Sequence, residues 1–204
     1  MILQAHDISI ERGGLRLLQN LSFSLKAGGS LVLRGPNGSG KTSLLRSLAG
    51  LAPIASGSVD YDPDDVCFFG HLDGVKSAMS VAENLRFWAS VYGQSNMDGA
   101  IELFELGPIL HKLGGHLSAG QKRRVGLSRL LISRAKIWLM DEPTVSLDQA
   151  KITELAEIVK THLASGGVTV LSTHADWPVE SAVCDLSKFK PHTSNPLAFG
   201  EALE

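Results

Sequence analysis

The sequence Gly35-Pro36-Asn37-Gly38-Ser39-Gly40-Lys41-Thr42 decides the fold of this 204-residue chain. It matches the pattern G-x-x-x-x-G-K-[ST] in full, between a short apolar run and a stretch whose leucines recur at helical spacing. The glycines let backbone N–H groups turn toward phosphate oxygens, and the following helix adds the positive end of its dipole. We expect Lys41 to reach the β- and γ-phosphates of a nucleotide and the Thr42 hydroxyl to ligate Mg²⁺.

Two carboxylates follow an apolar run near the middle of the chain. Residues Lys136–Met140 predict a buried strand, and Asp141 and Glu142 come directly after it. The carboxyl ends of strands are where open α/β sheets bind ligands. We expect Asp141 to hold Mg²⁺ through water and Glu142 to polarise the water that attacks a phosphate. An acidic turn alone would mean little, but together with the phosphate-binding loop it predicts a nucleoside triphosphatase.

The rest of the chain alternates short apolar runs with helical patterns, which predicts a layered α/β core. Further strands are expected at residues 65–70 and 167–173. Helices are expected at residues 80–93, where Ser80 and Glu83 fit a capping box, and at 98–106, from 118, at 148–165 and at 176–183. The polar tail after Pro191 is expected to be loosely ordered.

Composition narrows the class of protein. Hydrophobic residues make up 44% of the chain and charged residues 20%, which is typical of a soluble globular protein. The formal net charge of -2 does not fit a polycation that follows nucleic-acid backbones. No run approaches the ~20 apolar residues that cross a bilayer, and the first residues lack the apolar segment of a signal peptide. Two cysteines are too few for a disulfide scaffold. We therefore expect a cytoplasmic protein without a nucleic-acid partner.

The segment Leu117-Ser118-Ala119-Gly120-Gln121 narrows the class further. Ser118 and Gln121 fit a capping box, and a capped helix N-terminus is also an anion site. This segment resembles the signature motif of the ATP-binding cassettes of ABC transporters. Two later segments resemble other landmarks of that family. They are the D-loop, Val145-Ser146-Leu147-Asp148, and the segment that ends in the switch histidine, Ser172-Thr173-His174.

The resemblance runs from about Ile2 to Phe189 and implies a fold. That fold is a P-loop nucleoside triphosphatase with a RecA-like core, an antiparallel β region and a helical subdomain at roughly residues 80–133, all in one domain over residues 1–204. It also implies a homodimer that binds ATP and Mg²⁺. Each ATP would lie between the phosphate loop of one copy and residues of the other copy's signature motif, Ser118, Gly120 and Gln121.

The same resemblance implies how ATP hydrolysis is used. Glu142 and His174 would aid hydrolysis, and Asp148 of the D-loop would lie at the nucleotide. Closing and reopening of the dimer would drive integral membrane permease subunits from the cytoplasmic face of the inner membrane, where this chain is expected to bind as a peripheral subunit.

A narrower resemblance lies in residues 70–93, GHLDGVKSAMSVAENLRFWASVYG. This segment is similar to its equivalent in the ATP-binding subunits of cytochrome c biogenesis haem exporters, the CcmA type. The matching residues are Gly70, His71, Gly74, Lys76, Glu83, Asn84, Leu85 and Phe87, followed by Gln121, Arg123, Arg124 and Val125. The resemblance implies a complex that exports haem or releases it to a haem chaperone, with the haem handled by partner chains.

Two positions depart from the wider family pattern. Most cassettes present an aromatic ring to adenine upstream of the phosphate loop, whereas this chain has Arg12, whose guanidinium can stack on adenine. The position of the Q-loop glutamine, which contacts the γ-phosphate, is occupied by His71, which can donate or accept a hydrogen bond.

Other functions stay open at this stage. One alternative is the ATPase of another small ABC transporter. Soluble ABC ATPases that act on DNA or ribosomes resemble cassettes split by long coiled coils or fused in tandem, and this sequence has neither a heptad run nor a second phosphate loop. A P-loop kinase or nucleotide switch would leave the segment LSAGQ unexplained.

Overall fold

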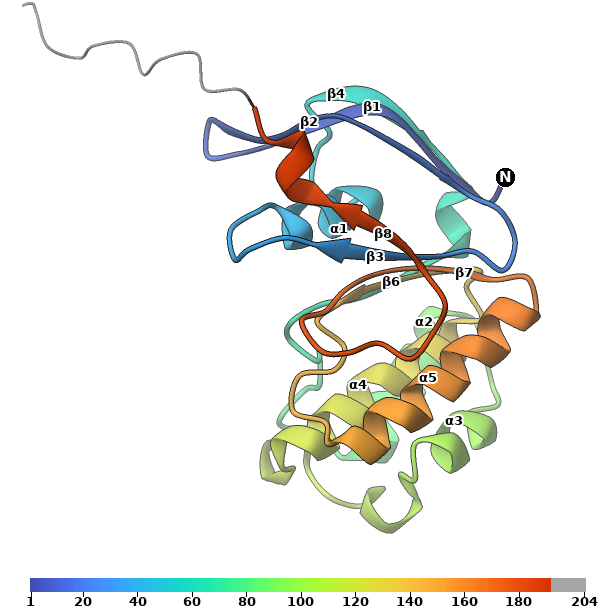
Figure 1. The fold of residues 1–204 in the computed structure, drawn as a ribbon. Helices are drawn as coiled ribbons and strands as arrows, with labels where there is room; N and C mark the ends of the chain where they lie inside the picture. Colours follow the sequence, from blue (N-terminus) through green and yellow to red (C-terminus); the bar gives the residue numbers. More distant parts are fainter. Residues whose placement is uncertain (192–204) are drawn as a thin grey trace, which may run out of the picture.

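The computed structural model describes residues 1–191, and its strands form two sheets (Figure 1). The smaller sheet is antiparallel, with the order β2-β1-β4. Its strands are β1 (Leu3–Arg12), β2 (Leu15–Leu25) and β4 (Ser56–Asp60). The larger sheet is parallel, with the order β5-β6-β7-β3-β8. Its strands are β3 (Ser30–Arg34), β5 (Val66–Phe69), β6 (Ile137–Asp141), β7 (Val168–Ser172) and β8 (Ala182–Asp185).

Five α-helices connect these strands. They are α1 (Lys41–Leu48), α2 (Val81–Val91), α3 (Asp98–Leu103), α4 (Ala119–Ser133) and α5 (Gln149–Ala164). The capping boxes predicted for Ser80 and Ser118 are both present, and they fix the first turns of α2 and α4. Short 3₁₀ turns lie at Pro63–Asp65, Gly107–Ile109, Gly114–His116 and Leu186–Phe189.

The larger sheet is covered on both faces, so β6 and β7 are buried along their whole length. Successive side chains of a strand point to opposite faces. Leu139 and Val170 accordingly pack with α1 and the smaller sheet, whereas Met140 and Leu171 pack with the helices on the other face. Figure 1 shows α1 on one side of the sheet and α4 and α5 on the other. The result is a three-layered α/β molecule.

The strand order places three loops at one edge of the sheet. β6, β7 and β3 are neighbours and run parallel, so their carboxyl ends meet at the same edge. The loops that leave these ends contain Gly35–Thr42, Asp141 with Glu142, and His174. Parallel α/β sheets bind ligands at such an edge.

The helix predicted at residues 176–183 is wrong. Residues 176–181 are irregular, and β8 begins at Ala182 and pairs with β3. Trp177 and Val179 are buried whereas Pro178 and Glu180 are exposed, which is the alternation of an extended chain. Pro178 also disfavours helical geometry at the residue before it.

Other predicted elements are confirmed or stay open. The helix expected at residues 98–106 ends at Leu103. The prediction for the tail after Pro191 lies outside the described residues, and the helical subdomain at about residues 80–133 stays a prediction, as does the single domain over residues 1–204. Within residues 1–191, no helix is both long enough and apolar enough to cross a membrane.

Candidate nucleotide-binding site

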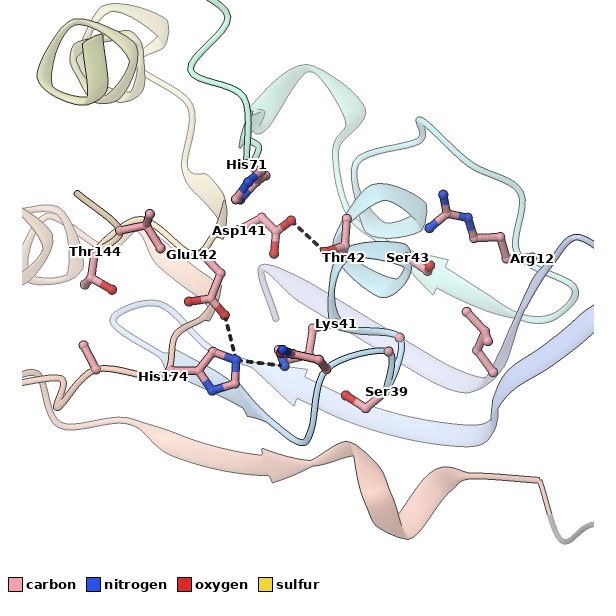
Figure 2. A pocket seen from close by; sticks show the side chains of 16 residues that line it. Arg12, Ser39, Lys41, Thr42, Ser43, His71, Asp141, Glu142, Thr144 and His174 are labelled. Atoms are coloured by element: carbon pink, nitrogen blue, oxygen red, sulfur yellow. Dashed lines mark hydrogen bonds and ion pairs between the residues drawn. The ribbon is translucent and has the colours of Figure 1, made fainter. Parts of the chain in front are cut away.

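A pocket of about 790 Å³ opens at the shared carboxyl edge of β3, β6 and β7 (Figure 2). Several groups predicted from the sequence line this pocket. They are Arg12, Asn37, Gly38, Ser39, Gly40, Lys41, Thr42, His71, Asp141, Glu142 and His174. Residues that are more than a hundred positions apart in the sequence thus share one cavity. Gly35 and Pro36 begin the phosphate loop but do not line the pocket.

The loop between β3 and α1 has the backbone of an anion cradle. Gly35, Gly38 and Gly40 have φ angles of 146°, 77° and 96°, which residues with a side chain rarely adopt. A Cβ atom at Gly35 would lie 2.7 Å from the Ser39 Oγ. That Oγ is buried and has no hydrogen-bond partner among the described residues. The Lys41 ammonium donates to the carbonyls of Gly35, at 2.8 Å, and Pro36, at 3.3 Å, so it lies over the loop.

Thr42 and Asp141 form an oxygen pair beside this loop. The Thr42 hydroxyl donates to Asp141 Oδ2 at 2.8 Å, and the Ser172 hydroxyl donates to Asp141 Oδ1 at 2.7 Å. Asp141 is buried, so both of its oxygens have fixed directions. Mg²⁺ takes hard oxygen ligands and is usually held by one or two protein groups plus phosphates and water. The Thr42 and Asp141 oxygens fit such an ion.

Glu142 and His174 face each other across the pocket (Figure 2). Glu142 Oε1 lies 3.5 Å from His174 Nε2. No hydrogen bond joins these two atoms, because this buried oxygen has no hydrogen-bond partner among the described residues. His174 Nε2 also lies 3.4 Å from the Lys41 ammonium. The glutamate side chain is 16% exposed and the histidine 59%, so a buried carboxylate oxygen lies at the cavity beside a more exposed ring.

The two residues that depart from the family pattern both reach the pocket. Arg12, at the end of β1, is exposed and lines the pocket together with Leu17 of β2. His71 is exposed and lies near Asp141 in Figure 2. It also lines a second groove of about 480 Å³, whose walls include Leu51 and Leu72.

Besides Gly35 and Pro36, four predicted residues do not line the pocket. Ser118, Gly120 and Gln121 form the first turn of α4, and Asp148 caps α5 by accepting a hydrogen bond from the Lys151 N–H. A Cβ atom at Gly120 would lie 3.3 Å from the Ser146 carbonyl, so the first turn of α4 and the loop between β6 and α5 are neighbours. Ser118 is exposed at the N-terminus of its helix.

Several lining residues were not predicted. Leu17 and Thr144 line the pocket, and the Ser172 hydroxyl orients Asp141 by donating a hydrogen bond to its carboxylate. The Thr144 and Thr173 hydroxyls lie 2.8 Å apart and join the loops after β6 and β7. Leu17 depends on how the smaller sheet folds over the phosphate loop, which no local pattern indicates. Ser172 lies in a strand that was expected at residues 167–173, but only the pairing of β6 with β7 places it beside Asp141.

Comparisons with known proteins agree with this geometry. The family model described as ABC transporter matches residues 18–145. Relatives include the cytochrome c biogenesis ATP-binding export protein CcmA of Paracoccus denitrificans, which is 46% identical over 206 residues and is matched over 98% of both chains. The protein of the same name from Rhodobacter capsulatus is 47% identical over 190 residues, covering 93% of this chain and 89% of its own.

A solved structure supports the same fold. It is a putative ABC transporter ATP-binding protein from Pyrococcus furiosus, which superposes with a TM-score of 0.82 at 25% identity. The match covers 93% of this chain and 99% of that one. The predicted fold class, with an antiparallel sheet, a parallel core and helices, is confirmed.

Proposed function

This chain belongs to the ABC transporter family and, within it, to the CcmA-type ATP-binding export proteins of cytochrome c biogenesis, and from that premise we propose how its site works. It is an ABC-type ATPase that binds nucleotide and works with membrane permease subunits. The observation that carries the residue-level proposal is the convergence of the phosphate loop, Asp141 and Glu142 on one pocket.

The phosphate loop binds the triphosphate of ATP. Backbone N–H groups of the phosphate loop donate to the phosphate oxygens, and Lys41 exchanges its carbonyl partners for β- and γ-phosphate oxygens. Thr42 and Asp141 hold Mg²⁺, Asp141 through water. A bound ion would supply positive charge that offsets the charge on the phosphates. Arg12 stacks on adenine at the mouth of the pocket.

Glu142 and His174 act on the γ-phosphate. The unpartnered Oε1 of Glu142 accepts a hydrogen bond from the attacking water and orients it in line with the bond that breaks. His174 lies between Glu142 and Lys41, where it donates to a γ-phosphate oxygen. His71 contacts the same phosphate from the opposite side of the pocket and takes the place of the Q-loop glutamine.

The working unit is a homodimer of this chain. Ser118, Gly120 and Gln121 lie outside the pocket of their own chain, and the N-terminus of α4 offers an anion site. Both facts support a composite site in which α4 of one copy covers the γ-phosphate bound by the other. Asp148 lies at the same interface.

The membrane partner binds beside His71. The second groove, of about 480 Å³, has the exposed apolar side chains Leu51 and Leu72 on its walls, which supports docking of a permease segment there. His71 lines both this groove and the nucleotide pocket. We place the subunit on the cytoplasmic face of the inner membrane. The cargo is haem, which is exported or released to a chaperone by partner chains, and no nucleic acid is involved.

The substitution Glu142→Gln tests the proposed chemistry. The amide keeps the shape of the side chain but polarises water poorly, so turnover should fall by about 100-fold or more while ATP binding is retained. ATPase assays and equilibrium binding of ATP, both on the assembled complex, measure the two quantities. Turnover within about threefold of the wild type would remove Glu142 from the chemistry.

A further inference from the structure

Arg123 is a buried cation that the proposed chemistry does not use. It lies in the second turn of α4 and is only 3% exposed. A buried guanidinium is costly unless its N–H groups have acceptors. Its side chain lies over the ring of Phe69, with 4.4 Å between its Cζ and the ring centroid. The position of Arg123 is therefore fixed on its apolar side by β5.

All three nitrogens of Arg123 donate hydrogen bonds, and their acceptors lie in two loops. Nε donates to the Pro143 carbonyl at 3.3 Å, and Nη2 donates to the carbonyls of Asp141, at 3.4 Å, and Glu142. One guanidinium thus holds the backbone at three successive residues of the loop after β6.

The remaining N–H groups hold the loop after β5. Nη1 donates to the His71 carbonyl at 3.2 Å and to Asp73 Oδ1 at 2.8 Å. One turn further along α4, Gly126 leaves room for the same loop, because a Cβ atom there would lie 2.7 Å from the Asp73 carbonyl. The face of α4 that contains Arg123 and Gly126 therefore fits closely against residues 71–73.

Glu142 needs this support because its backbone is in a disfavoured conformation. Its φ angle is 51°, in the left-handed region that residues other than glycine seldom adopt. Such a conformation persists only where the surroundings determine it. The N–H of Glu142 donates to Ser172, and its carbonyl accepts from Arg123. The two contacts fix the peptide groups on both sides of the catalytic side chain.

We infer that Arg123 is a positioning residue for ATP hydrolysis. By holding the carbonyls of residues 141–143, it aims the Glu142 carboxylate at the attacking water. By holding His71 and Asp73, it fixes the loop after β5 next to the same three residues. The inference rests on the proposed role of Glu142. In the proposed dimer, the first turn of α4 covers the partner's nucleotide. The inference adds that the second turn of α4 contacts the loop that contains Glu142 in its own chain.

The substitution Arg123→Lys tests this inference in the assembled complex. Lysine keeps the buried charge beside Asp73, but a single ammonium cannot replace a planar fork that reaches five acceptors. We expect kcat to fall at least about tenfold, because small misplacements of a catalytic group are costly. The KM for ATP and the Kd of a non-hydrolysable ATP analogue should stay within about twofold, since the phosphate loop is untouched.

A matched control lies next to it in the sequence. Arg124 donates to the Phe104 carbonyl at 3.0 Å and to Glu105 at 3.1 Å, and among the described residues it has no hydrogen bond to either loop. Arg124→Lys should therefore keep kcat near the wild-type value. All values of kcat are referred to the number of ATP-binding sites, so that a loss of folded protein does not count as a loss of turnover.

Two variants separate the possible failures. Arg123→Met fills the space over Phe69 but removes every donor, and its kcat should fall further than that of Arg123→Lys. Wild-type kcat per site in Arg123→Lys, with a lower melting temperature alone, would show a purely structural role and overturn the inference. If Arg123→Lys keeps wild-type kcat but Glu142→Gln loses turnover in the same series, the inference fails and the proposed function stands. If Glu142→Gln keeps turnover, both the proposed function and the inference fail.

Discussion

Single residues in this site depend on backbone conformations that few residue types adopt. Gly35, Gly38 and Gly40 supply the positive φ angles of the phosphate loop, and Glu142 adopts a similar angle without being glycine. Sequence patterns predict the glycines because their type indicates the conformation. No pattern predicts the conformation of Glu142 or the buried bonds of Arg123, since these depend on neighbours that are distant in the sequence.

The substitution Arg12→Ala tests the proposed contact between this single side chain and adenine. A cation stacked on an aromatic ring at an exposed site contributes ~0.5–1 kcal/mol, so ATP affinity should fall by about two- to fivefold. Affinity for inorganic tripolyphosphate should not change, because Arg12 lies at the adenine end in this account. Calorimetric titration with both ligands measures the two affinities. An equal loss for both would mean that Arg12 acts on phosphate charge and not on adenine.

At the scale of elements, local patterns predicted the parallel core well. Its strands β3, β6 and β7 are largely apolar runs buried on both faces, β5 alternates half-buried and buried residues, and capping boxes identify the starts of α2 and α4. The strands β1, β2 and β4 were expected only as an antiparallel region implied by the family resemblance. β8 was missed because its short sequence is mostly exposed and is a strand only through pairing with β3.

One helix contains a half-buried histidine that makes stability depend on pH. His162 of α5 stacks on Trp138 of β6, with 3.7 Å between ring centroids, and its Nε2 lies 3.1 Å from the Lys136 carbonyl. Burial lowers the pKa of His162 below its ordinary value. The unfolded chain therefore binds this proton at a higher pH than the folded chain does. The stability that depends on the neutral ring is complete above about pH 6.5 and is lost as the pH falls toward the folded-state pKa.

The substitution His162→Phe isolates this contribution. Phenylalanine keeps the stacked ring but cannot be protonated, so the variant should lose less unfolding free energy than the wild type between about pH 7.5 and about pH 5.5. Urea unfolding at both values measures the two losses. The comparison is between the two proteins, so that contributions shared by both cancel. Equal losses would show that His162 is not responsible.

At the scale of the whole molecule, the phosphate loop and the segment that begins α4 do not share a pocket. The phosphate loop, Asp141 and Glu142 line one pocket, whereas Ser118 begins α4 outside it. The groove beside His71 has the exposed apolar side chains Leu51 and Leu72 on its walls, and docking of a membrane subunit there is a proposal. Sequence motifs within the single chain predicted the family and the fold, and comparison confirmed both. The assembly involves a second copy of the chain and stays a proposal.

ATPase activity of mixed variants tests the composite site most directly. Ser118→Arg should leave ATP binding to the single chain intact but block closure, and Lys41→Ala should weaken phosphate binding, so each variant alone should hydrolyse little ATP. In a mixed dimer, the intact phosphate loop of the Ser118→Arg chain meets the intact Ser118 of the other chain, which restores one site of two. The account predicts activity from the mixture that neither variant shows alone and that does not exceed one working site per mixed dimer. Wild-type activity from either variant by itself, or none from the mixture when mixed dimers form, would contradict it.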